Sequence, residues 1–372
     1  MSKVRSLYKL IKVGLRNEYH HLRVKPLNSL VFLTFRCTSQ CKTCNIWTWG
    51  GDKSQELGTD EWLKVVSELK KAGIKALEIF GGDALLRKDA VFEIIKYCRH
   101  NGIQTHFPTN ANLCDRETVK NLIESGLFTV YLSLDELGEA HDDIRGTHGT
   151  FSRVIGALEA FLSLRGPAQT PRIIVCTTVS NMNFRNLPEI VQLLEKYQVD
   201  AIYPRILGEF STNNIERSCL DGIFPEPYFV PTDAPTHLFT KNELAEFKKI
   251  LRHIKTKKSC IYIDFRPFDL ADDKTFLEGI HKFKKCHLAT TLVTVDPSGN
   301  VSPCPFYLSY KIGNLKEESI DTIWGNPSHR KFIKFQQKRK LAICSNCNLR
   351  VYYPSMMETF SWRLKKAVRY YG

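Results

Sequence analysis

Short apolar runs alternate with amphipathic stretches along the chain from residue 30 onward. Apolar runs bounded by Gly, Pro, Asn, Asp or Ser are typical of buried strands. This pattern predicts strands at Leu30–Phe35, Ala76–Gly81, Gln104–Asn110, Thr129–Asp135, Arg172–Ser180 and Ala201–Leu207. The stretches with helical spacing between them predict helices at Thr59–Ala72, Lys88–Asn101, Arg116–Ser125, Thr150–Leu164 and Leu187–Tyr197.

The regular exchange of strand and helix favours a parallel sheet with right-handed crossovers. Six strand–helix units are too few to close an eight-stranded barrel. We therefore predict the α/β fold class, as a partial (β/α)6 TIM-like barrel over residues 28–207 with a small Cys-rich domain at the C-terminal end. In such folds the active site collects at the C-terminal ends of the strands.

The pattern breaks after the sixth predicted strand. Residues 208–240 are rich in proline and show little periodicity, so we expect a long loop that covers the mouth of the barrel. A helix at Lys241–Lys257 follows, and residues 208–280 are interpreted as a lid loop and a bridging helix. Residues 281–350 hold four cysteines and form the predicted C-terminal domain.

Both ends of the chain are basic. The formal net charge is +14, and residues 1–25 and 339–372 each hold seven Lys or Arg against one Glu. The body carries only about +2, so no DNA partner is expected. In the arm 1–27 and the tail 351–372, apolar and basic residues fall on different helical faces, which suits peripheral contact with an anionic membrane. Packing on the barrel with a solvated basic face, or contact with RNA, are the alternatives.

No apolar run is long enough to span a bilayer. The N-terminus also lacks the apolar core and the cleavage site of a signal peptide. These observations predict a cytoplasmic protein, with peripheral membrane contact left open by its basic ends. Because thiols stay reduced in that compartment, twelve cysteines favour metal ligation over disulfides.

Three cysteines stand close together directly after the first predicted strand. Cys37, Cys41 and Cys44 have C-x-x-x-C-x-x-C spacing, and a loop there can bring three thiolates to one iron–sulfur cluster. Three ligands leave one iron of a four-iron cluster open to a cofactor, whereas a fourth would close it. A zinc knuckle, or three unrelated cysteines, are the alternatives.

This spacing after the first strand resembles the signature of the radical S-adenosylmethionine (radical SAM) superfamily, and the resemblance covers about residues 28–350. It implies a [4Fe-4S] cluster whose open iron binds S-adenosylmethionine, which is cleaved reductively to methionine and a 5′-deoxyadenosyl radical. It also implies that this radical abstracts hydrogen from substrate, and that a flavodoxin- or ferredoxin-type protein donates the electron. Thr43 departs from the family, which commonly has an aromatic residue there, and Trp47 and Trp49 are candidates to replace it.

Other positions on the predicted strands resemble cofactor-binding motifs of that family. Gly81, Gly82 and Asp83 end the second strand, where relatives have a Gly-Gly-Glu-type turn that holds the amino group of the cofactor. Ser133 and Asp135 lie on one face at the end of the fourth strand, as in the motif that contacts the ribose or the carboxylate. The resemblance therefore implies that these five residues bind S-adenosylmethionine.

Arg145 follows the fourth predicted strand, in a segment that resembles one common in relatives with additional clusters. Its guanidinium is a candidate partner for the methionine carboxylate of the cofactor through a bidentate contact. Pairing of Arg145 with Asp142 or Asp143 is equally compatible with the sequence.

A second group of cysteines follows the bridging helix. Its members are Cys286, Cys304, Cys344 and Cys347, and a hairpin turn is predicted at Asp296–Asn300 between the first two. The group resembles the twitch domain, the shortened form of the SPASM auxiliary-cluster domain. This resemblance implies one auxiliary [4Fe-4S] cluster, fully ligated by cysteine, that transfers electrons. A tetrahedral zinc site is the alternative.

The five remaining cysteines are Cys98, Cys114, Cys176, Cys219 and Cys260. We expect most of them to be buried packing residues. Cys219 lies in the expected lid loop, and its thiol is a weak candidate catalytic residue that returns a hydrogen atom to a substrate radical.

The sequence favours a radical enzyme that oxidises or rearranges a small molecule such as a sugar, a cyclitol or a lipid head group. A ribosomal-peptide maturase that forms a crosslink is the first alternative. That class usually carries a peptide-docking domain before the barrel, and only about 28 residues precede the first predicted strand. The second alternative is a non-catalytic iron–sulfur or zinc protein that binds RNA or membrane, which would need no cofactor pocket.

Overall fold

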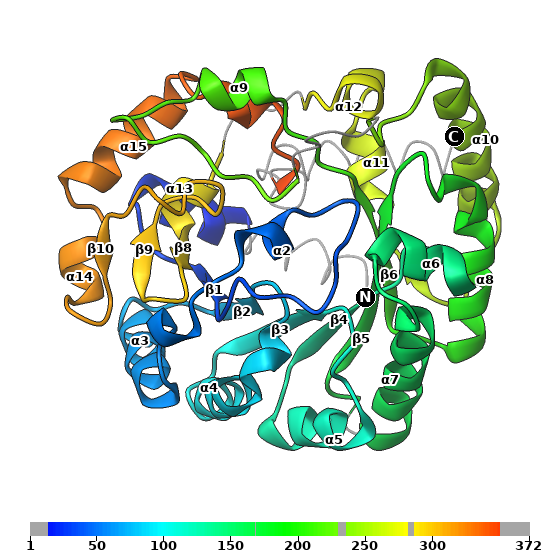
Figure 1. The fold of residues 1–372 in the computed structure, drawn as a ribbon, viewed down its shortest axis with the longest axis horizontal. Coiled ribbons are helices and arrows are strands. Elements are labelled where there is room, and N and C mark those ends of the chain that lie inside the picture. The colour runs from blue at the N-terminus through cyan, green and yellow to red at the C-terminus, as the bar shows by residue number, and fades with distance from the viewer. Residues whose placement is uncertain (1–13, 168, 230–235, 282–285, 350–372) are drawn as a thin grey trace.

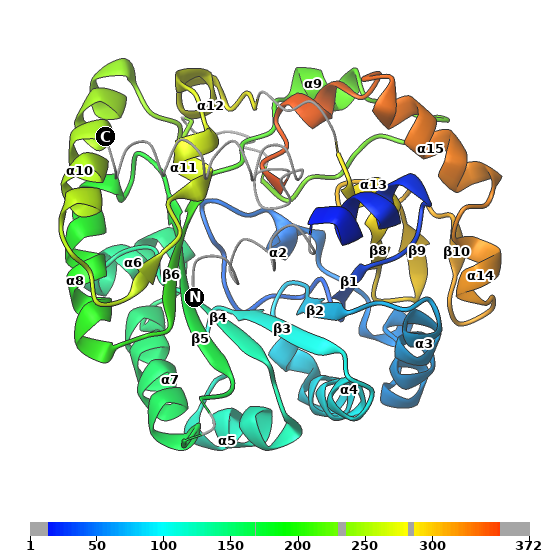
Figure 2. The same ribbon diagram turned by 180° about the vertical axis from the view of Figure 1, so that it is seen from behind.

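The computed structural model describes residues 14–167, 169–229, 236–281 and 286–349. In this part of the chain the strands form one sheet in the order β10-β9-β8-β1-β2-β3-β4-β5-β6-β7. The pairs from β1 to β7 are all parallel. Figures 1 and 2 show this sheet curving around an open interior with helices on its outside. The predicted partial TIM-like barrel is therefore confirmed.

Each of the six predicted strands is present, with one to three residues fewer at its C-terminal end. The strands are β1 (Asn28–Phe32), β2 (Ala76–Phe80), β3 (Gln104–Thr109), β4 (Thr129–Ser133), β5 (Arg172–Val179) and β6 (Ala201–Ile206). The strand β1 starts and ends earlier than predicted, because the residues after Leu33 bond to the turn that follows β2. There the Gly82 N–H donates to the Thr34 carbonyl at 2.9 Å.

The predicted helices of the barrel are also confirmed, to within one residue at their ends. They are α3 (Thr59–Lys71), α4 (Lys88–His100), α5 (Arg116–Ser125), α7 (Thr150–Leu164) and α8 (Leu187–Tyr197). Each buries one apolar face, which in α3 is formed by Trp62, Val65, Val66 and Leu69. The short helix α6 (Gly138–Arg145) was not predicted, because its sequence is mostly polar.

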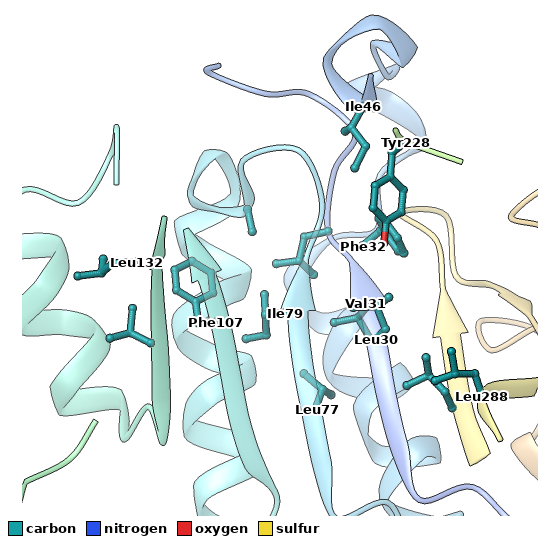
Figure 3. Packing of buried hydrophobic residues seen from close by; sticks show 14 of the residues in the cluster. Leu30, Val31, Phe32, Ile46, Leu77, Ile79, Phe107, Leu132, Tyr228 and Leu288 are labelled. Carbon is teal, nitrogen blue, oxygen red and sulfur yellow. The ribbon is translucent and has the colours of Figure 1, made fainter. Parts of the chain in front are cut away.

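Side chains at alternate positions of a strand face opposite ways. In β2, Leu77 and Ile79 are fully buried in the layer between the sheet and the helices, and Figure 3 shows them among their apolar neighbours. Burial of one such side chain stabilises the fold by roughly 1.5–3 kcal/mol. Ala76, Glu78 and Phe80 of the same strand face the interior of the barrel instead. The helices thus pack on the apolar outer face of the sheet, and the inner face can carry polar residues of a functional site.

The Cys-rich region extends the barrel sheet. Strand β8 (Leu292–Val295) is parallel to β1, and β9 (Asn300–Ser302) and β10 (Gly313–Asn314) add to it in antiparallel pairs. The predicted hairpin turn is confirmed between β8 and β9, where the Asp296 carboxylate accepts the N–H groups of Ser298 and Asn300 at 2.9 Å. The sequence pattern did not show that this region pairs with the first strand of the barrel.

The other elements connect and cover these strands. They are α2 (Ile46–Trp49), α9 (Thr212–Glu216), α10 (Lys241–Thr256), β7 (Tyr262–Ile263), α11 (Arg266–Leu270), α12 (Asp273–Glu278), α13 (Leu288–Thr291), α14 (Ile320–Ile323) and α15 (Pro327–Gln337). Four short 3-10 helices complete the list of described elements: η1 (Lys53–Gln55), η2 (Ala84–Arg87), η3 (Phe184–Asn186) and η4 (Ala342–Ser345). The predicted bridging helix corresponds to α10.

The two basic ends lie mostly outside the described residues, which start at residue 14 and end at residue 349. Residues 14–22 are helical, and His21 in this helix is buried with its Nδ1 atom 2.7 Å from the Thr290 hydroxyl. Leu15 and Leu22 on the same helix are exposed. Among the described helices, none has the length and apolar character needed to cross a membrane.

Candidate functional site

A cavity of about 500 Å³ fills the interior of the barrel. Its wall consists of the inward-facing residues of β1 to β6, the start of β8, and residues that follow β6. The lining residues are Asn28, Ser29, Leu30, Ala76, Glu78, Phe80, His106, Pro108, Tyr131, Ser133, Cys176, Thr178, Tyr203, Arg205, Ile206, Gly208, Tyr228, Phe229, Arg266, Leu292, Asn348 and Leu349. Asn348, the residue after Cys347, is one of these lining residues. Tyr228 is another, and its carbonyl accepts the N–H of Asn45, the residue after Cys44.

The first cysteine group lies in the loop between β1 and α2. Cys37, Cys41 and Cys44 are half-buried thiols. Burial raises the pKa of Cys37 to about 11 and that of Cys44 to about 12, and the nearby Cys41 adds to both shifts. The three thiols are therefore neighbours in a dry loop. This donor set fits a cluster held by three cysteines, because iron replaces the protons of the thiols when it binds.

A glycine turn after β2 holds the base of this loop. The Asp83 N–H donates to the Arg36 carbonyl at 2.8 Å, one residue before Cys37. A Cβ atom on Gly82 would lie 2.2 Å from the same carbonyl oxygen, and one on Gly81 would lie 2.3 Å from the Thr34 oxygen. Only glycine permits this close approach of two backbones. The turn and the cysteine loop thus form one unit.

The Asp83 side chain faces the cysteine loop. It is 4% exposed, it accepts the Leu85 N–H at 3.1 Å, and it accepts the hydroxyl of Thr38. Burial raises the pKa of Asp83, and the Asp83 charge in turn raises the pKa of Cys37. A carboxylate beside the three thiols can accept from an ammonium group of a cofactor.

Asp135 and Arg145 form a buried ion pair next to the same loop. The Arg145 Nη2 atom is 2.7 Å from Asp135 Oδ2, and Arg145 Nη1 is 3.9 Å from Cys41 Sγ. Burial raises the pKa of Asp135, and Arg145 opposes that shift. Asp135 Oδ1 also accepts the Thr178 N–H at 2.7 Å. Ser133, two residues earlier, lines the cavity.

The alternative partners of Arg145 are engaged elsewhere, so that interpretation was wrong. Asp142 caps the start of α7, where it accepts the N–H groups of Gly149 and Phe151. Asp143 pairs with Lys42 at 2.6 Å on the surface. The local sequence could not reveal the partner of Arg145, because Asp135 lies on a different element.

Asn110 and Asn112, at the end of β3, anchor the cysteine loop. The sequence suggested Asn110 as a pocket residue on the third strand, whereas Asn112 was not predicted. The Asn110 amide donates to the Thr38 and Ser39 hydroxyls at 3.1 Å, and the Asn112 amide donates to the Ser39 hydroxyl at 2.9 Å. Their position in the sequence could have indicated this role, since polar residues at the carboxyl end of a barrel strand tend to be functional.

Neither tryptophan near Thr43 faces the cavity. Trp47 is 38% exposed. Trp49 packs its ring against Phe35, with the centroids 5.4 Å apart, and against Tyr228 at 6.3 Å. Trp49 therefore packs against residues on either side of the cysteine loop. That either tryptophan replaces the aromatic residue usual at position 43 remains a prediction.

The second cysteine group also comes together in space. Burial raises the pKa of Cys304 well above its usual value, and Cys347, Cys344 and Cys286 each raise it further. These residues lie after β9, in and after η4, and before α13. Within the described ranges no set of three or more His, Cys, Asp or Glu side chains is placed to hold a single metal ion. Four neighbouring thiols in a buried site fit a fully ligated cluster.

The remaining cysteines behave less uniformly than expected. Cys98 and Cys114 are buried, as predicted for packing residues, but Cys219 and Cys260 are exposed and Cys176 is half-buried. Cys176 lines the cavity, whereas Cys219 does not. The expectation that most of the five are buried was wrong, because two of them lie in irregular surface segments that apolar patterns do not describe.

Polar and ionisable side chains of the barrel strands line the cavity. Burial raises the pKa of Glu78 to about 7, and Arg205 on β6 opposes that shift. Burial lowers the pKa of His106, the register partner of Glu78, to about 4. The neutral ring of His106 is 3.2 Å from the Tyr131 hydroxyl through Nδ1. Sequence reasoning missed these groups, although a glutamate inside an apolar strand is itself a signal.

Two family profiles match the chain. The profile described as Radical SAM superfamily matches residues 31–196, and the SPASM profile, described as Iron-sulfur cluster-binding domain, matches residues 286–348. The first match contains the three cysteines after β1, the glycine turn and the Asp135–Arg145 pair. The second contains all four cysteines of the second group. An iron–sulfur domain there replaces the zinc alternative for that group.

Curated relatives resemble part of the chain. An Fe-coproporphyrin III synthase of Methanosarcina barkeri is 30% identical over 170 residues, which are 46% of this chain and 41% of that protein. A PqqA peptide cyclase of Bradyrhizobium diazoefficiens is 32% identical over 182 residues, which are 48% of this chain and 45% of that protein. The matched segment thus spans less than half the length of either relative.

A solved structure shares the fold over most of the chain. Streptococcus suis SuiB bound to its precursor peptide SuiA superposes with a TM-score of 0.63 at 15% identity, over 93% of this chain and 76% of that one. At this level of identity the likeness concerns the fold alone.

Proposed function

Since the chain belongs to the radical SAM superfamily and carries a SPASM-type auxiliary-cluster domain at residues 286–348, we propose that it oxidises or rearranges a small polar molecule held in the barrel cavity. The two domains define an enzyme with a SAM-binding [4Fe-4S] cluster and an auxiliary iron–sulfur cluster. A sugar, a cyclitol or a lipid head group is the proposed substrate class.

One observation carries this proposal: the wall of the cavity of about 500 Å³ carries a carboxylate, an imidazole, phenols and guanidinium groups. A volume of this order suits a compact ligand, since small-molecule sites commonly measure about 300–1,000 Å³. Several hydrogen-bonding groups on an otherwise apolar wall suit a molecule with many hydroxyl groups.

In this proposal Cys37, Cys41 and Cys44 hold the first cluster and Cys286, Cys304, Cys344 and Cys347 hold the auxiliary cluster. When bound, S-adenosylmethionine and its cluster supply a 5′-deoxyadenosyl radical. Asp83 accepts from the amino group of the cofactor, and Ser133 contacts the cofactor from the cavity wall. The ion pair of Asp135 and Arg145 fixes the guanidinium beside Cys41, where it can donate to a carboxylate.

Glu78 is the proposed proton acceptor. In an alcohol oxidation the substrate gives up a hydrogen atom from carbon, one electron, and one proton from oxygen. The bound cofactor and clusters would take the hydrogen atom and the electron, and Glu78 would take the proton. The Glu78 carboxylate lines the cavity and makes no hydrogen bond within the described part of the chain. The titratable groups that act on Glu78 or feel its charge are Arg205, Tyr131, Tyr228 and Cys176. A carboxylate with a pKa of about 7 is suited to accept and release a proton near neutral pH.

A peptide substrate is the second candidate function. It is favoured by the identity of 32% to a PqqA peptide cyclase over 48% of the chain. The cavity favours the small molecule, because barrel strands and the buried Tyr228 line it and its volume of about 500 Å³ suits a compact ligand.

A substrate screen distinguishes the two candidates. The chain is reconstituted with iron and sulfide without oxygen, then given dithionite and S-adenosylmethionine, and the release of 5′-deoxyadenosine is measured with deuterated aldoses, cyclitols, glycerol phosphates or synthetic peptides. We expect one of the small molecules to accelerate release and to transfer deuterium into 5′-deoxyadenosine. Deuterium transfer from peptides and from none of the small molecules would overturn the proposal. A flavodoxin or ferredoxin should replace dithionite as electron donor.

A further inference from the structure

Residues 225–229 connect the two cysteine groups directly. This segment, here called the strap, follows α9 and ends at the cavity wall. The Asn45 N–H donates to the Tyr228 carbonyl at 2.8 Å, and the Glu226 N–H donates to the Phe306 carbonyl at 2.8 Å. Asn45 follows Cys44 immediately, and Phe306 is two residues beyond Cys304. The strap is thus hydrogen-bonded next to a cysteine of each group.

The strap is held stiffly in this position. Pro225 and Pro227 fix two of its five φ angles. The Glu226 carboxylate accepts from the backbone of Ser309 at 3.1 Å and from its hydroxyl at 2.6 Å. At the other end, the Phe229 carbonyl accepts the Phe210 N–H at 3.1 Å. Glu226, Tyr228 and Phe229 are therefore each hydrogen-bonded to another segment.

The Tyr228 ring fills the space between the two groups. Its centroid lies 5.1 Å from that of Phe306 and 5.8 Å from that of Phe80 on β2. Figure 3 shows the ring standing above Phe32, with its hydroxyl pointing toward the end of β1. Burial raises the pKa of the Tyr228 hydroxyl well above its usual value, and Glu78, Cys44, Cys347 and Cys304 raise it further. A single side chain therefore lies within electrostatic range of both cysteine groups and of the cavity.

We propose that the Tyr228 ring is the packed contact through which one electron passes between the SAM-binding site and the auxiliary site. The inference rests on the two cluster sites of the proposed function and not on the identity of the substrate. In this step one site is oxidised and the other reduced by one electron. Tyr228 is a positioning residue here: its phenol stays protonated and is neither oxidised nor reduced.

The physical reason is continuity of packing. Protein interiors are close-packed, so neighbouring atoms are in van der Waals contact. A void breaks these contacts on any electron-transfer route that crosses it. The route from Cys44 runs through Asn45, the Tyr228 backbone and ring, and the ring of Phe306 to Cys304. Replacement of the ring by a branched aliphatic side chain opens a gap in the middle of this route, whereas loss of the hydroxyl alone does not.

The test measures electron transfer without substrate. Wild type, Tyr228→Leu and Tyr228→Phe are reconstituted with both clusters and given less than one electron per chain by flash photoreduction with a deazaflavin. Freeze-quench electron paramagnetic resonance follows the redistribution of that electron between the two clusters. Phe210→Leu is the matched control, because the Phe210 ring packs on Phe306 with the centroids 4.7 Å apart, does not belong to the proposed route and does not line the cavity. Iron content and cluster spectra are measured for each variant.

We expect Tyr228→Leu to slow the concentration-independent redistribution by about tenfold or more, because the gap interrupts the packed route. Tyr228→Phe and Phe210→Leu should keep the wild-type rate. An unchanged rate in Tyr228→Leu would overturn the proposal. If Tyr228→Leu fails to hold both clusters, Tyr228→Phe still tests the proposal. A slow rate in Tyr228→Phe would assign the electron-transfer role to the hydroxyl and would contradict a role of the ring. None of these outcomes depends on a substrate, so they stand apart from the substrate screen.

Discussion

The guanidinium of Arg145 lies 2.7 Å from the Asp135 carboxylate and 3.9 Å from the sulfur of Cys41. The side chains of the pair are 13% and 1% exposed. Arg145 thus links the end of β4, through Asp135, to the loop that holds the first cysteine group. The ion pair therefore joins two segments of the fold directly beside the first cysteine group.

Removal of one partner of this pair should destabilise the protein. Arg145→Met leaves Asp135 buried without its counter-charge, which should lower the free energy of unfolding by about 3 kcal/mol. The double variant Asp135→Asn with Arg145→Met should recover part of that loss, because no buried charge is left unpaired. Denaturant unfolding of the metal-free protein under anaerobic conditions measures both values. Equal destabilisation of the single and double variants would contradict this account.

The glycine turn after β2 should tolerate no side chain. A Cβ atom at residue 82 would lie 2.2 Å from the Arg36 carbonyl oxygen, so Gly82→Ala must push the turn away from the cysteine loop. We expect the bound iron to fall from about eight toward about four per chain, because the atoms nearest to the added Cβ belong to Arg36 and Phe35, just before Cys37, and not to the second cysteine group. Gly156→Ala is the control, since nothing lies within 4 Å of a Cβ there. Iron assay after reconstitution gives the answer, and full iron content in Gly82→Ala would refute it.

The two cysteine groups should respond differently to mutation. Replacement of Cys37, Cys41 and Cys44 by alanine should abolish 5′-deoxyadenosine formation, since the reductive cleavage needs the cluster that binds the cofactor. Replacement of Cys344 and Cys347 should remove about half of the iron but leave cleavage without substrate largely intact. Chromatographic quantification of 5′-deoxyadenosine checks both. Loss of cleavage in the second variant would show that the two sites are not separable in this way.

Glu78 should make the stability depend on pH. Burial raises its pKa to about 7 in the folded protein from an ordinary value of 4.5, so the folded state binds more protons than the unfolded chain between these pH values. Stability therefore falls as the pH rises from 4.5 to 7, and the loss is complete above pH 7. Glu78→Gln should raise the melting temperature by about 2 °C at pH 8 and change it little at pH 4.5.

The control for that comparison is Glu278→Gln. Glu278 is an exposed residue of α12, so its replacement should give the same small effect at both pH values. Differential scanning fluorimetry under anaerobic conditions provides the melting temperatures. A melting temperature of Glu78→Gln that exceeds that of the wild type equally at both pH values would rule out titration of Glu78 as the cause.

Local patterns predicted the barrel because each strand is an apolar run and each helix has one apolar face. They also placed Cys37, Asp83 and Asp135 at strand ends, where the structure brings them to one loop. The patterns failed where position depends on remote contacts. Tyr228 lies in a proline-rich segment without periodicity, and its place is set by hydrogen bonds to Asn45 and packing on Phe306.

Glu78 shows a second reason why the sequence alone could not predict part of the site. Its position inside β2 could be predicted, but its environment depends on what the opposite strands present to the cavity. Arg205 on β6 and Tyr131 on β4 reach it only because the sheet curves around on itself. The sequence therefore predicted the grouping of the cysteines better than the set of residues that line the cavity.

The pairing of β8 with β1 has a consequence for the chain as a folding unit. In β1 the N–H and C=O groups of one side bond to β2, and those of the other side bond to β8. A truncated chain without β8 would expose a buried, apolar strand as an open edge, and such edges recruit other chains into aggregates. We expect the barrel to be insoluble when expressed without the C-terminal region, and both halves to unfold in one cooperative transition. Mutations that weaken either cluster region should therefore lower the yield of the whole protein.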